Sequence, residues 1–196
     1  NLSGSPSPTS ARHVYDDMNG RIPCILDDGR CAVGIESTVI SFEGDSIRLL
    51  RPGFISVSDL KEVTENVIVD KGVLDIVSQD AVVASPGMKY KHYSPKADVI
   101  IIDGSLDSFR KYVSDNKVEG TWCMTFSESD LSGIDCPAVV YGSTDEEQAR
   151  RIFNALRELD KHGAKKVFAR CPGKTGIGLA VYNRLLRAAG FQVIRL

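Results

Sequence analysis

Hydrophobic residues in the second half of the chain alternate between two spacings. Short apolar runs typical of strands occupy 98–102, 121–126, 138–141, 166–169 and 191–194. Between them, apolar residues follow helical spacing at 106–114, 145–160 and 179–189. In 145–160 they form one face, made of Ala149, Ile152, Phe153, Leu156 and Leu159. This alternation predicts an α/β fold, with a small, mostly parallel sheet of the Rossmann type and right-handed crossovers.

The first part of the chain has a different pattern, in which short strands dominate. A stretch rich in Gly, Ser and Pro at 1–9 leads into a predicted helix at 11–18, for which we expect Ser7 as the N-cap and Pro8 in the first turn. We expect strands at 23–26, 35–42, 47–50 and 66–70, and a short capping-box helix at 56–63. The segments 35–42 and 47–50 should form a hairpin. We therefore place one domain at 1–83, a linker at 84–97 and a second domain at 98–196.

The predicted linker contains a stretch, 86–95, that is unusually rich in functional groups. Its terminal prolines disfavour a helix, and in an extended path Tyr90 and His92 would share one side. Lys89, Lys91 and Tyr93 would share the other. One interpretation is an ordinary solvated linker. The other is a strap that lies across a neighbouring anionic site and helps to close it.

Composition narrows the function classes. The chain has 196 residues, a hydrophobic fraction of 42% and a net charge of -2, so it can fold around a core and is not a polyanion binder as a whole. Five scattered cysteines without a CxxC pair favour reduced thiols in the cytoplasm and give no metal-site spacing. No apolar run reaches the roughly 18 residues that cross a bilayer.

Several residues of the first part are candidates for binding an anion. The 1–9 loop could cradle a phosphate at the start of the following helix, although such a start can serve the helix cap alone. Arg51 ends a predicted strand, where a guanidinium can grip a phosphate or carboxylate or simply be exposed. Small hydroxyl residues such as Ser37, close to Gly34, leave room for something to approach the backbone. For His13 we expect a surface or packing role.

Two motifs in the second half resemble nucleotide-binding loops but fail. The segment 173–175 looks like the end of a P-loop, yet Phe168 stands where that loop needs its first glycine. The segment 176–178 lacks the third glycine of a dinucleotide fingerprint. We therefore expect the Rossmann-like half to support or regulate, and not to bind a nucleotide by itself.

Several ordered motifs together resemble one family. They are the segments 1–4, 7–9, 34–39, 50–53, 86–95 and 176–185. In this order and spacing they resemble the threonylcarbamoyl-AMP synthases of the two-domain type. The resemblance implies a partial YrdC-like α/β catalytic domain followed by the Rossmann-like domain. Because the chain begins at the asparagine of the family's Ser-Ala-Asn motif, it also implies an N-terminally incomplete fragment.

The resemblance also implies a reaction and a set of binding residues. The family is expected to condense L-threonine, bicarbonate and ATP, with Mg²⁺, into threonylcarbamoyl-adenylate and pyrophosphate. That product serves a downstream transferase complex that modifies tRNA. Residues that match the ATP-binding positions are Asn1, Thr9, Arg51, Tyr90 and His92. Ser37 matches the threonine-binding position, and no residue of this chain is expected to bind a metal.

Two other function classes remain open from the residues themselves. A binding module could hold RNA on Lys89, Lys91, His92 and Lys96, with bases stacked on Tyr90 and Tyr93. A nucleotide-sensing regulatory protein without turnover is the other. Release of pyrophosphate that depends on threonine would separate the synthase from both.

Overall fold

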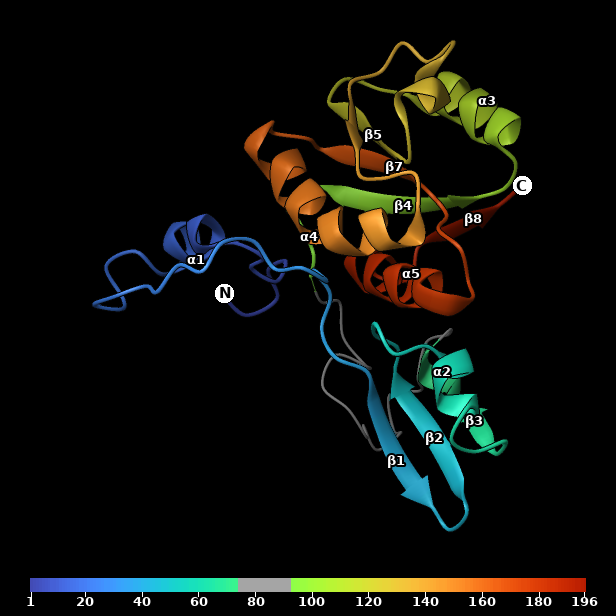
Figure 1. Cartoon of the computed structure of the whole chain (residues 1–196). Coiled ribbons are helices and arrows are strands. Elements are labelled where there is room, and N and C mark those ends of the chain that lie inside the picture. The colour runs from blue at the N-terminus through green and yellow to red at the C-terminus, as the bar shows by residue number, and fades with distance from the viewer. Residues whose placement is uncertain (74–92) are drawn as a thin grey trace.

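The computed structural model describes residues 1–73 and 93–196, and Figure 1 shows their arrangement. The larger part is an α/β layer structure formed by the second half of the chain. The predicted positions Lys89, Lys91, Tyr90 and His92 lie outside the described residues. The linker limits of 84–97 therefore stay a prediction.

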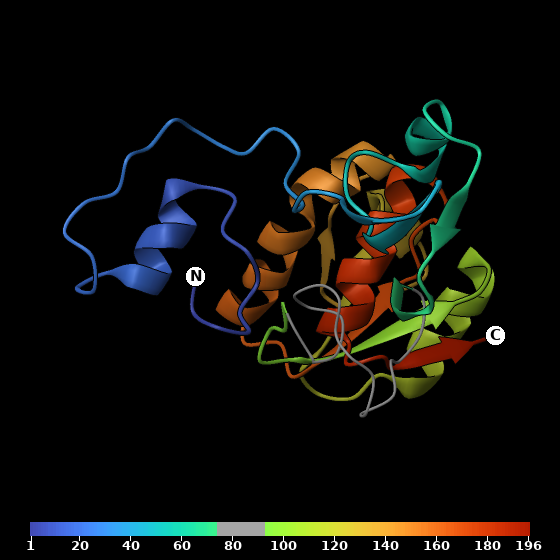
Figure 2. The same ribbon diagram turned by 90° about the horizontal axis from the view of Figure 1, so that it is seen from below.

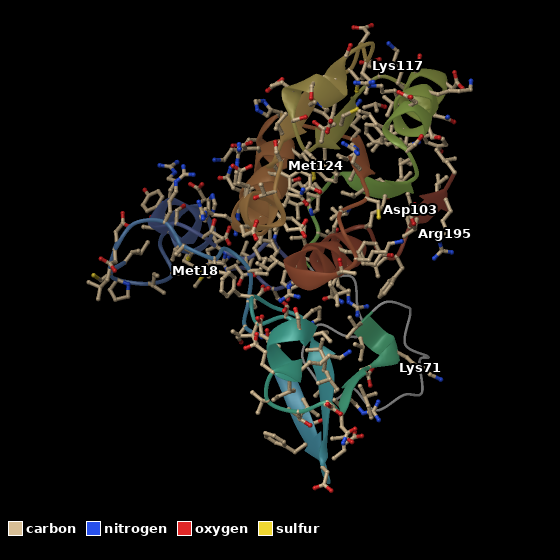
Figure 3. The ribbon with its side chains drawn as sticks, turned by 45° about the vertical axis from the view of Figure 1, so that its right-hand side comes forward. Met18, Lys71, Asp103, Lys117, Met124 and Arg195 are labelled. Atoms are coloured by element: carbon tan, nitrogen blue, oxygen red, sulfur yellow. The ribbon has the colours of Figure 1, made fainter. Side chains whose placement is uncertain are left out.

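A five-stranded parallel sheet forms the centre of the second half. Its strands are β4 (Asp98–Asp103), β5 (Thr121–Thr125), β6 (Ala138–Val140), β7 (Lys166–Arg170) and β8 (Val193–Arg195). They lie in the order β6-β5-β7-β4-β8, and each neighbouring pair is parallel. The predicted parallel α/β fold is confirmed. Asp103 and Arg195 are partners in register at the ends of β4 and β8, and they lie side by side in Figure 3.

Helices cover both faces of this sheet. α3 (Leu106–Asn116) covers one face, and α4 (Asp145–Lys161) and α5 (Gly176–Ala188) cover the other (Figure 1). The period-two alternation of β4 explains this, because Ile101 packs in the core under α4 and α5 while Ile102 packs under α3. Met124 of β5 lies within the α4 side of the core (Figure 3).

The first part folds into a helix and a separate small sheet. α1 (Ala11–Met18) is followed by a long irregular segment, and then by β1 (Val39–Glu43), β2 (Ser46–Arg51), α2 (Val57–Lys61) and β3 (Val67–Val69). The sheet order is β1-β2-β3, with β1 antiparallel and β3 parallel to β2. The hairpin and the capping box at Ser56 are confirmed. Short 3₁₀ turns lie at Lys71–Val73 and Glu128–Leu131.

Three local predictions were wrong. Ser10, with an extended φ of -155°, is the N-cap of α1, and the Ser7 hydroxyl instead donates to Glu36. The segment 23–26 forms no strand, because no neighbouring strand pairs with it, and the Leu26 side chain is 94% exposed. The predicted strand at 35–42 begins only at Val39, where the register with β2 shifts.

The first part lies against α4 and α5 at two places. α1 lies beside α4, whereas the three-stranded sheet lies below α5 in Figure 1, and Figure 2 shows the same separation from another side. The Arg157 guanidinium of α4 reaches Asp17 at 2.7 Å, and Arg184 of α5 reaches Glu36 at 2.7 Å. The helix layer of the second half therefore holds both pieces of the first part. Within the described residues, no helix is long and apolar enough to cross a membrane.

Candidate binding site at the Ser37 and Arg51 contact

Ser37 and Arg51, which the family resemblance assigns to threonine and ATP, contact each other. Arg51 is the last residue of β2, and its Nε donates to the Ser37 carbonyl oxygen at 3.0 Å. Its Nη2 donates to Ser37 Oγ at 3.2 Å. Ser37 is exposed and Arg51 is half-buried, so both remain accessible to a ligand. Among the described residues, Arg51 Nη1 has no hydrogen-bond partner, and this edge of the guanidinium can face an anion.

The backbone around this pair is held close by a glycine turn. A Cβ at Gly53 would lie 2.3 Å from the Thr38 nitrogen, so only glycine lets the two segments meet. Thr38 Oγ1 donates to the Ile55 carbonyl oxygen at 2.7 Å and ties the same segments together. The turn after β2 therefore sets where Ser37 lies.

Glu36, next to Ser37, is the acceptor at the centre of the site. Its carboxylate accepts from Ser7 Oγ at 2.6 Å and from Arg184 Nε at 2.7 Å. Burial alone would raise the pKa of Glu36, but the charge of Arg184 and the hydrogen bonds from Ser7 and Arg184 outweigh it and hold the pKa below its ordinary value. Glu36 is therefore ionised at neutral pH.

Arg184 is fully buried at the same place. Besides Glu36 Oε2, its guanidinium donates to the Pro52 carbonyl oxygen at 2.7 Å and to the Glu36 carbonyl oxygen at 3.3 Å. Asn183 Oδ1 also accepts from it, at 3.2 Å. A buried arginine with this many partners is satisfied both in charge and in hydrogen bonding.

The described end of the predicted strap lies beside these residues. The buried Tyr93 ring packs on Phe153, with centroids 5.1 Å apart. Burial, followed by the negative charge of Glu36, raises the pKa of Tyr93, so its hydroxyl stays protonated. Ser94 N donates to the Gly4 carbonyl oxygen at 3.0 Å, and Ser94 Oγ donates to the Ala188 carbonyl oxygen at 2.9 Å. The strap therefore ends between the N-terminal loop and α5.

Thr9 lies deeper and borders two cavities. One has about 290 Å³ and is lined by three arginines, Arg30, Arg150 and Arg151. The other has about 190 Å³ and extends from Thr9 to Glu36. The second cavity therefore reaches from Thr9 to the residue before Ser37. Asn1, by contrast, is exposed and donates to the Ser5 carbonyl oxygen at 2.9 Å.

His13 has a packing role, as expected, and supports Thr9. The buried imidazole accepts from the Thr9 backbone N–H at Nδ1 (3.1 Å), while Nε2 lies 3.2 Å from Asn154 Oδ1. Because Thr9 N–H can only donate, Nδ1 is unprotonated and the proton is on Nε2. Burial and then the charge of Arg157 lower the pKa of His13. The neutral ring therefore links the N-terminal loop to α4.

Sequence reasoning missed Glu36 and Arg184. Glu36 lies next to hydroxyl residues, and these indicate ligand binding more directly than Glu36 does. Arg184 lies in a segment whose hydrophobic pattern indicates only a helix. One signal could have found Arg184: α5 is largely apolar, and the polar residues within it include Asn183, Arg184 and Arg187, of types that are rarely buried unless they are paired. In the described part of the chain, no group of three or more His, Cys, Asp or Glu side chains could hold a metal ion.

Two family models match adjacent parts of the chain. Residues 55–190 match the family described as threonylcarbamoyl-AMP synthase, C-terminal domain. Residues 1–53 match the family described as telomere recombination. The threonylcarbamoyl-AMP synthase of Pyrococcus abyssi is 39% identical over 202 residues, and that of Bacillus subtilis is 38% identical over 199. Both alignments cover 100% of this chain and 57% of the relative, so the chain spans a little over half the length of these curated relatives.

A solved structure agrees in fold over the same length. The crystal structure of Pyrococcus abyssi Sua5 complexed with L-threonine has a TM-score of 0.88 and is 36% identical, covering 100% of this chain and 58% of that one. The fold thus defines an α/β protein with a parallel Rossmann-like sheet, and two helices of its second half, α4 and α5, form ion pairs with the first part of the chain. The chain belongs to the threonylcarbamoyl-AMP synthase family.

Proposed function

We propose that this chain works in a threonylcarbamoyl-AMP synthase, a nucleotidyltransferase of the cytoplasm. The reaction takes L-threonine, bicarbonate and ATP and yields threonylcarbamoyl-adenylate, pyrophosphate and water. The threonine nitrogen forms a bond to the bicarbonate carbon while a C–O bond of bicarbonate breaks and water leaves. An oxygen of the resulting carbamate then attacks the α-phosphorus, and the bond from that phosphorus to the pyrophosphate oxygen breaks as pyrophosphate leaves. The adenylate would serve a downstream tRNA-modifying transferase complex.

The contact between Arg51 and Ser37 carries the proposal. A reaction that joins an amino acid to a nucleotide needs their two binding groups side by side, and Arg51 donates to Ser37 through two nitrogens. In the proposed site, Ser37 binds threonine and Arg51 binds phosphate through its remaining edge. A relative of known structure holds L-threonine, which supports an amino-acid site in this family.

The remaining assignments follow from position. Thr9, which borders both cavities, and Asn1 in the same loop would contact the nucleotide. Tyr90 and His92 would reach the site from the strap, whose end at Tyr93 lies near Glu36. Such a site needs alignment and charge neutralisation more than covalent participation of the protein. Mg²⁺ would arrive with the triphosphate, and because the described residues offer no group of ligands for it, we assign it no step.

Pyrophosphate release tests this function directly. The full-length gene product is incubated with ATP, bicarbonate and either threonine or no amino acid, and pyrophosphate is measured. We expect release that depends on both threonine and bicarbonate and is lost in Ser37→Ala at low threonine concentration. Release that is independent of threonine would reject the synthase and favour a nucleotide-sensing module. Salt-sensitive RNA binding without any release would favour the RNA-binding module.

A further inference from the structure

We propose that Arg184 is a positioning residue for the substrate site, through which the second half of the chain sets the geometry of the Ser37 and Arg51 pair. The inference rests on the proposed function for the roles of these two residues. In this proposal, α5 of the Rossmann-like half holds the backbone on either side of the binding pair.

The contacts of Arg184 form a closed ring with the pair. Its Nη2 donates to the carbonyl oxygen of Glu36, the residue before Ser37. Its Nη1 donates to the carbonyl oxygen of Pro52, the residue after Arg51. The ring is closed on its other side by the two hydrogen bonds from Arg51 to Ser37. A shift of the guanidinium therefore moves both segments that carry the binding groups.

A third contact fixes the guanidinium itself. Arg184 Nε lies 2.7 Å from Glu36 Oε2, and the exposed fraction of the side chain is 0% for Arg184 and 24% for Glu36. Ser7 Oγ holds the other carboxylate oxygen at 2.6 Å, which connects the N-terminal loop to the same ring. The position of Arg184 is thus determined from three segments of the first part of the chain.

Stability alone does not require an arginine here. α5 packs through apolar neighbours such as Val181 and Leu185, and removing two charges from water offsets much of the gain from pairing them. A well-packed apolar residue would often dock the helix equally well. What it cannot do is donate to three oxygens in fixed directions, and lysine cannot do so either, because its ammonium lacks the planar fork of the guanidinium.

The chain offers a matched control at the same boundary. Arg157 of α4 also has a largely buried side chain, 10% exposed, and its guanidinium reaches across to the first part, where Asp17 accepts at 2.7 and 2.9 Å. Its third acceptor is the Pro6 carbonyl oxygen. The two arginines thus make the same kind of contact, but only Arg184 holds the residues next to Ser37 and Arg51.

The test measures threonine binding and local protection in the full-length gene product. Arg184→Met, Arg184→Lys and Arg157→Met are compared with the wild type by calorimetric titration with L-threonine and by hydrogen exchange of peptides covering 34–39 and 50–53. Unfolding curves are recorded for each, so that binding is compared only where every variant is folded. If Arg184→Met does not fold, Arg184→Lys and Glu36→Gln take its place.

We expect Arg184→Met to raise the Kd for threonine about tenfold or more, and to speed exchange in both peptides, because a displaced binding group loses much of its effect. Arg184→Lys should lie between it and the wild type. Arg157→Met should leave the threonine Kd and both peptides unchanged even if it lowers stability.

Equal effects of Arg184→Met and Arg157→Met on threonine binding would overturn the proposal, as would wild-type binding and exchange in Arg184→Met. If the wild type binds no threonine, the proposed function fails. The exchange of 34–39 and 50–53 still decides whether Arg184 holds these segments.

Discussion

Gly34 lies directly against the backbone of Arg150 in α4. A Cβ at Gly34 would be 2.5 Å from Arg150 Cα and 2.6 Å from the Ala149 carbonyl oxygen, and Gly34 has a φ of +87°. Arg150 Nε also donates to the carbonyl oxygen of Ala32, the residue two positions before Gly34, at 3.0 Å. The segment that leads to Glu36 and Ser37 is thus seated on α4 by a close approach that only glycine permits.

Replacing Gly34 by alanine should destabilise the protein by about 2–4 kcal/mol. A left-handed backbone costs an alanine roughly 1–2 kcal/mol, and the backbone atoms of α4 cannot yield to the added methyl group without further cost. Gly29→Ala is the control, since Gly29 has a similar φ of +89° and open space around it. We expect Gly29→Ala to show the conformational cost alone. Equal losses in urea unfolding would show that the contact with α4 contributes nothing.

Gly34 shows which parts of the fold can be predicted from the sequence and which cannot. The small hydroxyl residues next to Gly34 predicted room for an approach to the backbone, and at Gly34 itself the structure places the backbone of α4. The approaching element, α4, lies more than 100 residues away and could not be predicted from local pattern. The parallel sheet was predicted because its strands and helices have strong periodicity. The strand at 23–26 was wrong because a strand needs a partner, and its sequence alone does not provide one.

Acid should weaken the protein through His13. Burial, followed by the charge of Arg157, lowers the pKa of this imidazole below 6.5, so the unfolded chain binds its proton at a higher pH than the folded one. The stabilisation is complete above pH 6.5 and is lost as the pH falls toward the folded pKa. Protonation of His13 also puts a hydrogen on Nδ1, which then faces the Thr9 N–H as a second donor and can no longer accept its hydrogen bond.

His13→Gln provides the measurement. The free energy of unfolding is determined from about pH 7.5 downward for the wild type and the variant. Below pH 6.5, the free energy of unfolding of the wild type should fall more steeply than that of His13→Gln, by up to about 1.4 kcal/mol per pH unit. Parallel curves would mean that the imidazole is already free to protonate in the folded state.

Arg51→Ala should weaken ATP binding by roughly tenfold to 100-fold, the range expected when a hydrogen bond to a charged group worth about 1.5–3 kcal/mol is lost. Arg48→Ala is a matched control on the same strand, because Arg48 pairs with Glu43 at 2.5 Å and not with Ser37. Affinity is measured by calorimetry on the full-length gene product with a non-hydrolysable ATP analogue. Unchanged affinity in Arg51→Ala would remove this residue from the nucleotide site.

The candidate site was predictable only in part, for a physical reason. Local motifs predict Ser37 and Arg51 separately, and the structure brings the two residues into contact. Glu36 and Arg184 act through each other across 148 positions of sequence, so neither has a local pattern that announces the pair. Side chains that bind ligands can be recognised in short motifs from their chemistry. Side chains that position those motifs depend on packing between elements that are distant in sequence.

Tyr90→Ala or His92→Ala should impair turnover without loss of the fold. Both positions precede Tyr93, which is fixed on Phe153 beside Glu36, and Ser94, which binds the N-terminal loop at Gly4. A strap anchored at this point is attached next to the proposed nucleotide loop, and its rings and imidazole are suited to closing a site over a phosphate. Threonine-dependent pyrophosphate release should fall at least roughly tenfold in either variant, as expected when a positioned group is removed.

The midpoint of thermal unfolding of either variant should stay within a few degrees of that of the wild type. Wild-type kinetics in both variants would reduce the strap to a spacer between the two halves.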